Sequence, residues 1–195
     1  MSDTILDGTG SGYKAKVYSD NKLAARVTSL SDNQESVLEG TAWNINTGWI
    51  SSISSDSALI YFKSEEDSDF FIDSIAVGLK ESSATEVQGI YFVVQPTGGT
   101  LVSAATDCDM IENRRIGSGV SLDSSTLVYK ATANGQTLTG GRDAALFAQN
   151  DGGRLFAQVD FVLPKGQACG VRLEVLGGFS DDVYCALIGH KRKLL

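Results

Sequence analysis

The stretch LFAQVDFVLPKGQACGVRLEVLGGFSDDVYCALIG, residues 155–189, decides the fold class. In its first part every second residue is apolar, which is the period of a strand with one buried face: Leu155, Ala157, Val159, Phe161 and Leu163. The alternation returns from Cys169 to Val175 after a Pro164–Gly166 turn. Residues 183–188 are almost wholly apolar, as in a strand covered on both faces. No helical period competes, so the stretch predicts antiparallel β-structure.

The rest of the chain adds β-like segments around this stretch. Further strands are predicted at 58–63, 70–79, 89–95 and 127–131, with shorter runs at 15–17 and 23–27. Residues 100–104 are expected to return as a strand beside 89–95. Asp32 and Glu35 stand in capping-box register and predict a single helical turn. Apart from 127–131, residues 106–151 carry repeated turn signals and predict long irregular loops that contact another protein.

These elements indicate an all-β protein, an antiparallel β-sandwich with a flexible N-terminal arm and long loops. We expect residues 1–35 to hold the arm and short strands, and residues 36–195 to form one β-sandwich domain. Residues 1–13 are rich in Asp, Gly, Thr and Ser, which favours an arm that orders against a neighbouring subunit. The spacing of Gly8, Gly10, Gly12 and Lys14 fits neither common phosphate-binding loop.

Charge and cysteine content exclude several classes of partner. The formal net charge of −8 and the pI near 4.6 disfavour binding to nucleic acid and to anionic membranes. The sequence has neither an apolar run long enough for a transmembrane helix nor the features of a signal peptide. Three widely spaced cysteines disfavour a disulfide framework or a CxxC metal site, and buried thiols are favoured over a Cys169–Cys185 bridge.

The residues do not compose a recognisable catalytic site. His190 is the only histidine, and the GxSxG and HExxH patterns are absent. The acidic run 64–69 lacks the spacing of an EF-hand, so a solvated hairpin tip is favoured over a calcium site. Asp73 and Asp160 interrupt apolar strands, where solvent-facing positions are the simpler interpretation. We therefore expect no enzyme, no metal and no cofactor, although two carboxylates alone could serve a glycoside hydrolase.

Several phrases, in order along most of the chain, resemble virion structural proteins of tailed bacteriophages, of the head decoration or cement type. They are DGTGSGYKAKV (7–17), AWNINTG (42–48), LIYFK (59–63) with Phe71-Ile72, NRR (113–115), TLTGG (137–141) and LPKG (163–166). The resemblance implies a jelly-roll or related β-sandwich without catalytic residues. It also implies binding to the major capsid protein on the outer surface of the head, often as a homotrimer, or a minor place in the tail. Reduced cysteines fit assembly in a bacterial cytoplasm.

Candidate contact residues follow from the aromatic and basic positions of the chain. Trp43 and Trp49 suit either a sugar platform or packing in a core or a subunit interface, and packing is favoured. The basic tail can dock on an acidic neighbour or end in solvent. The candidates for contacts with the capsid or between subunits are Tyr13, Lys14, Trp43, Trp49, Arg114, Arg115, Arg142, Lys191, Arg192 and Lys193. The alternative function is a tail-tip or fibre-associated protein that binds host glycan through the tryptophans and the loop tyrosines. A carboxylate hydrolase is the third hypothesis.

Overall fold

In the computed structural model the chain divides into two units, residues 1–31 and residues 32–195. The structure describes residues 4–6, 14–17, 23–24, 32–80, 88–103, 106–108, 110–149 and 154–192. In the first unit these are three short antiparallel strands, β1 (Thr4–Leu6), β2 (Lys14–Val17) and β3 (Leu23–Ala24). Strand β1 lies within the segment expected to be a flexible arm, and the glycines of that segment are outside the described residues.

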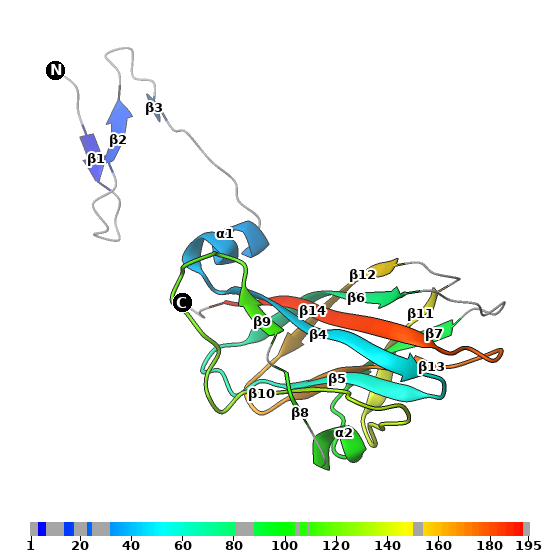
Figure 1. Ribbon diagram of the computed structural model, residues 1–195. Helices are drawn as coiled ribbons and strands as arrows, with labels where there is room; N and C mark the ends of the chain where they lie inside the picture. The colour runs from blue at the N-terminus through cyan, green and yellow to red at the C-terminus, as the bar shows by residue number, and fades with distance from the viewer. Residues whose placement is uncertain are drawn as a thin grey trace. The chain divides into compact units, whose positions relative to one another are not determined.

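The second unit is the predicted antiparallel β-sandwich (Figure 1). One sheet has five strands, in the order β12 (Arg154–Leu163), β6 (Phe70–Leu79), β14 (Asp181–Lys191), β4 (Ala42–Ile53) and β9 (Met110–Asn113). The other has six, in the order β11 (Arg142–Gln149), β7 (Gln88–Val94), β13 (Ala168–Glu174), β5 (Ser57–Lys63), β10 (Leu127–Lys130) and β8 (Thr106–Asp107). The strands predicted from residues 155–189 are β12, β13 and β14, and they alternate between the two sheets.

The eight long strands form four nested antiparallel pairs. Strand β4 pairs with β14, β5 with β13, β6 with β12, and β7 with β11. Successive pairs belong to alternate sheets, so the chain folds as one long hairpin wrapped around the core. In this arrangement each of the eight strands is hydrogen-bonded to a strand far away in the sequence.

The core lies between the sheets and is filled by side chains that share one face of each strand. Its largest fully buried members include Trp43, Phe62, Phe70, Phe92 and Phe179. The rings of Phe62 and Phe70 pack with their centroids 4.7 Å apart, and that of Trp43 lies 6.0 Å from Phe70. Burying one such side chain contributes roughly 1.5–3 kcal/mol, so this layer supplies the main stabilisation of the sandwich.

All three cysteines are free and buried, as the sequence favoured. Cys169 lies on β13 and Cys185 on β14, so the two thiols belong to opposite sheets. Burial raises the pKa of both thiols, which keeps them protonated. The thiol of Cys108 donates a hydrogen bond to the carbonyl oxygen of Asn46 over 2.8 Å.

Two predictions about local structure were wrong. Residues expected to return as a strand form a short helix, α2 (Thr100–Ser103), because Thr100 and Thr137 exchange backbone-to-hydroxyl hydrogen bonds of 3.2 and 2.9 Å. The supposedly irregular middle contains β11, β8 and β9 besides β10. The predicted helical turn extends over two turns as α1 (Asp32–Glu39). No helix among the described residues is long and apolar enough to cross a membrane.

The edge strands β12 and β11 both carry β-bulges. In β12 the register shifts between Gln158 and Phe161, where Asp160 has a φ of 49°. In β11 it shifts between Asp143 and Ala145. Bulges on edge strands interrupt the row of unpaired backbone groups, so they disfavour strand-to-strand pairing with another chain.

Candidate functional site

The only histidine forms a buried polar pair. The Nδ1 atom of His190 lies 3.0 Å from a carboxylate oxygen of Asp73, and its ring stacks on Phe71 with centroids 5.1 Å apart. His190 is buried, and in the described part of the chain no serine or cysteine side chain is hydrogen-bonded to the imidazole. The pair joins β6 to the end of β14. Asp73, expected to face solvent, instead serves this contact.

The acidic hairpin tip at residues 64–69 is not wholly solvated, which corrects the sequence interpretation. Glu66 is 3% exposed. One of its carboxylate oxygens accepts the backbone N–H of Asp123 over 2.6 Å, and the other is 2.7 Å from Nζ of Lys191. Among the described residues no group of three or more His, Cys, Asp and Glu side chains is placed to hold a metal ion.

Two of the predicted contact residues, Lys191 and Trp43, are largely or wholly buried. Lys191 was expected in an accessible basic tail, but its side chain is 17% exposed and its Nζ lies 4.8 Å from the ring centroid of Trp43. Trp43 itself is 1% exposed, so it packs in the core and offers no contact surface. The packing interpretation is correct for this tryptophan.

Trp49 has the opposite environment because of a bulge in β4. Trp49 pairs with Tyr184 and Asn46 with Ala186, so β4 has one residue more than β14 between these two pairs. The extra residue reverses the alternation of inward- and outward-facing side chains in β4. Gly48, with a φ of 63°, allows this backbone, and the Thr47 hydroxyl accepts the N–H of Cys185 over 3.0 Å. A bulge redirects the side chains that follow it. Trp49 consequently faces outward and is 49% exposed.

Trp49 borders a hollow on the outer face of the five-stranded sheet. Trp49, Tyr184, Gly78 and Arg154 form one cross-strand row over β4, β14, β6 and β12. The hollow has a volume of about 420 Å³, and we call it the aromatic hollow; its lining includes Trp49, Ala76, Gly78, Arg154, Phe156 and Tyr184. The rings of Trp49 and Tyr184 pack at a 54° angle with centroids 5.9 Å apart. Phe156 is 68% exposed.

A second exposed feature is the loop that follows β9, residues 114–120. Its tip is a β-turn in which the N–H of Ser118 donates to the carbonyl oxygen of Arg115 over 3.1 Å. Gly117, with a φ of 76°, is the third residue of this turn, where a type II turn requires glycine. Ile116 precedes it and is 99% exposed. We call residues 114–120 the Ile116 loop.

The Ile116 loop is held by α1 and by its own polar groups. The Asn113 side-chain amide donates to the carbonyl oxygens of Gly40 and Val120 over 2.6 and 3.2 Å. A guanidinium nitrogen of Arg115 donates to the carbonyl oxygen of Leu38 over 2.5 Å. The predicted contact residues Arg114 and Arg115 thus lie, both exposed, beside Ile116.

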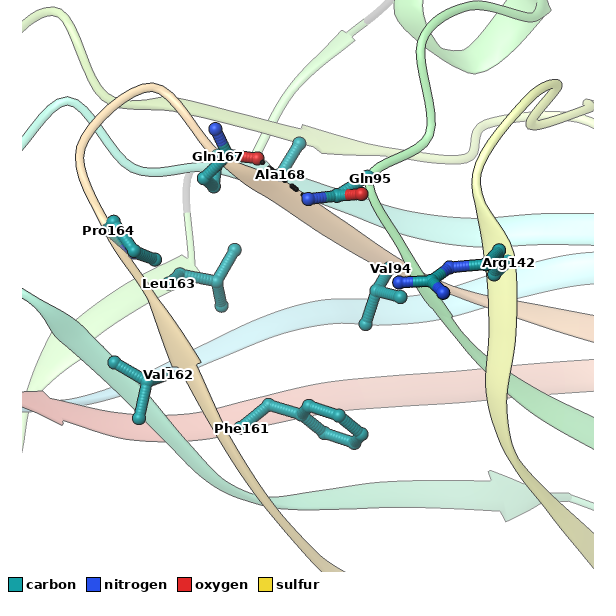
Figure 2. A pocket seen from close by; sticks show the side chains of 9 residues that line it. All are labelled: Val94, Gln95, Arg142, Phe161, Val162, Leu163, Pro164, Gln167 and Ala168. Carbon is teal, nitrogen blue, oxygen red and sulfur yellow. Dashed lines mark hydrogen bonds between the residues drawn. The ribbon is translucent and has the colours of Figure 1, made fainter.

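A second hollow, of about 350 Å³, lies where β12 turns into β13 (Figure 2). Phe161 and Val162 line it beneath the predicted contact residue Arg142. The side-chain amides of Gln95 and Gln167 are hydrogen-bonded to each other over 3.2 Å, as Figure 2 shows. Because these two polar groups already bind one another, the hollow offers a ligand chiefly an apolar floor and one guanidinium.

The remaining predicted contacts are spread over the chain. Arg192 is exposed after the end of β14. Lys14 belongs to β2, and Tyr13 and Lys193 lie outside the described residues. The sequence did not single out Ile116, Tyr184, Arg154 or Phe156. The alternation of β12 predicts that Arg154 and Phe156 face outward. Their proximity to Trp49 follows only from the order of the strands in the sheet, which the local pattern does not predict.

Comparisons of the chain with protein-family models, with curated proteins and with solved structures found no match.

Proposed function

We propose that this chain is a decoration protein of a tailed-phage head, which binds outside the shell and stabilises it by bridging neighbouring subunits. The resemblance of its sequence motifs to such proteins supports the proposal. The nested strand pairs support it as well, because we infer from them a jelly roll, an architecture used by many viral capsid proteins. The proposed site of action is the outer surface of the head.

The Ile116 loop is the observation that carries a protein-binding function. A fully exposed isoleucine at the tip of a hydrogen-bonded turn gains apolar burial when it enters a pocket on a partner. Because the loop is already ordered by Asn113 and Arg115, little conformational freedom is lost on binding. Such an arrangement is typical of an anchor residue in an interface.

The flanking charges indicate the chemistry of the partner. Arg114 and Arg115 stand beside Ile116 on a protein whose net charge is −8. The complementary surface on the major capsid protein is an apolar pocket bordered by carboxylates or backbone carbonyl groups. Protein bound only to the intact lattice stabilises that lattice by mass action. Binding as a trimer, which the resemblance implies, would strengthen attachment by raising the effective concentration of each loop.

Co-sedimentation with undecorated heads of the phage that encodes the protein tests the proposal. We expect the wild-type chain to bind, and Ile116→Asp to weaken binding by about tenfold or more, as loss of an anchor residue does. Leu146→Asp is the matched control, since Leu146 is also exposed, at 60%, but lies on β11 of the other sheet. Equal binding of Ile116→Asp and Leu146→Asp would refute the role of the loop.

A further inference from the structure

The aromatic hollow combines an apolar platform with one cationic group. A methyl group placed on Gly78 would lie 3.8 Å from Cη2 of Trp49 and 3.7 Å from Cγ of Arg154. The indole therefore extends from β4 across β14 to β6, while the arginine approaches the same point from β12. Gly78 and Ala76 keep the floor low between them.

The floor of the hollow has no backbone groups to offer a peptide. Strands β14 and β6 each pair with a neighbour on both sides, so their backbone polar groups are used within the sheet. An extended peptide would find no ladder to join on this floor, whereas β12, which borders the hollow through Arg154 and Phe156, is a sheet edge. A ligand must instead be recognised by ring faces and side-chain polar groups.

The available polar groups suit an anion and a hydroxyl-bearing ligand. Within the described part of the chain, no carboxylate is within ion-pair distance of Arg154, and no residue hydrogen-bonds to the hydroxyl of Tyr184. A guanidinium recognises a carboxylate through two parallel hydrogen bonds. Burial, followed by Cys185 and Glu112, raises the pKa of Tyr184. Its phenol is therefore neutral and able to donate a hydrogen bond.

We propose that the aromatic hollow binds an acidic sugar residue of a glycan chain. The apolar face of a pyranose ring stacks on Trp49, its carboxylate pairs with Arg154, and its hydroxyl groups reach Tyr184. A volume of about 420 Å³ lies within the range of small-molecule sites and suits one or two sugar residues. This site is independent of the Ile116 loop, which begins beyond the opposite end of β4, where Asn113 pairs with Trp43.

Binding to an oligosaccharide array, followed by titration, tests this assignment. The probes are uronic-acid oligosaccharides, sialyl-oligosaccharides and their neutral counterparts, which separates the two sources of a sugar carboxylate. We expect acidic probes to bind more tightly than neutral ones, and Trp49→Ala to weaken binding by about tenfold or more. Arg154→Gln should abolish the preference for acidic over neutral probes. Gly78→Val, which fills the hollow from its floor, should abolish binding while Trp49, Arg154 and Tyr184 all remain.

Two controls distinguish a loss of glycan binding from a loss of head binding or of the fold. Head co-sedimentation by Trp49→Ala should match the wild type, because the Ile116 loop is unchanged. A circular-dichroism melt of each variant should show one cooperative transition. Absence of binding to every acidic oligosaccharide would overturn the proposal. So would binding that Trp49→Ala and Gly78→Val leave unchanged, or binding of acidic peptides in preference to glycans.

Discussion

At the scale of single residues, two tryptophans six positions apart have different tasks. Trp43 is 1% exposed and packs against Phe70, whereas Trp49 is 49% exposed on the sheet surface. Both would face the core if β4 were regular, because they occupy positions of the same parity. The extra residue at Thr47–Gly48 separates their roles, so one stabilises the sandwich and the other remains available to a ligand.

Truncating the two tryptophans should therefore have unequal effects on stability. We expect Trp43→Ala to lower the free energy of unfolding by about 3–5 kcal/mol, because it leaves a cavity in the core. Trp49→Ala should cost about 1–2 kcal/mol, since half of its surface is already in water. Urea unfolding of both variants measures the difference. Equal losses would contradict the outward orientation of Trp49.

The carboxylate of Glu66 is a second residue whose importance exceeds its place at a hairpin tip. It pairs with Lys191 over 2.7 Å and accepts the N–H of Asp123 over 2.6 Å. Glu66→Ala should lower the free energy of unfolding by about 2–3 kcal/mol, because Lys191 stays largely buried without its partner. Thermal denaturation should show this as a midpoint lower by about 5–10 °C.

Exchange of Glu66 for glutamine is the matched control. Glu66→Gln retains an oxygen for the N–H of Asp123, so it should destabilise less than Glu66→Ala. A midpoint unchanged in both variants would show that the hairpin tip is solvated after all.

At the scale of elements, the carboxylate of Asp182 connects the ends of neighbouring strands. Asp182, on β14, accepts the N–H of Ser52 at the end of β4 over 3.1 Å and pairs with Nζ of Lys80 after β6 over 3.1 Å. The hydrogen bond from Lys80, and then that from Ser52, lowers the pKa of this carboxyl. One ionised side chain thus joins the ends of three neighbouring strands of the five-stranded sheet.

The lowered pKa of Asp182 predicts a defined pH dependence. A carboxyl with a lower pKa in the folded than in the unfolded state stabilises the fold above its unfolded pKa, about 4. That contribution is lost as the pH falls through the folded pKa. We expect Asp182→Asn to be less stable than wild type at pH 7 and to approach it near pH 2. Urea unfolding across this range is the test, and a constant difference between the two proteins would contradict it.

Elements differ in how well the sequence predicts them. Residues 155–189 predicted β12 and β13 because burial on one face imposes a period of two, and they predicted β14 because residues 183–188 are almost wholly apolar. The run RDAALFAQ of β11 gave no such signal, since it is an edge strand whose residues from Arg142 to Ala144 are all exposed. The apolar and β-branched residues of α2 resemble a strand, and a hydrogen-bonded contact with Thr137, distant in sequence, overrides them. The aromatic hollow needs four strands in register, which no local pattern encodes.

At the scale of the sandwich unit, nested pairing produces one cooperative core. Each pair joins distant segments, and the buried cluster draws on strands from both sheets. Local opening of one pair therefore exposes the core shared by all. Two surfaces are displayed on this rigid support, the Ile116 loop and the aromatic hollow.

The buried cysteines should report on this cooperativity. All three thiols are buried, and burial raises the pKa of Cys169 and Cys185, so native protein should react negligibly with Ellman's reagent at about pH 8. In denaturing urea all three should react rapidly. The rate in subdenaturing urea should follow the global unfolding equilibrium. Fast native labelling of either strand cysteine would indicate an open or loosely packed sandwich.

The most direct test of the proposed function is the stoichiometry of binding to undecorated heads. We predict that sedimented wild-type protein rises with concentration and saturates at a fixed ratio to the major capsid protein, as binding to repeated lattice positions requires. Saturation at a few copies per particle, or no binding at all, would contradict decoration of the head. That result would move the protein to the tail and make the aromatic hollow its principal functional site.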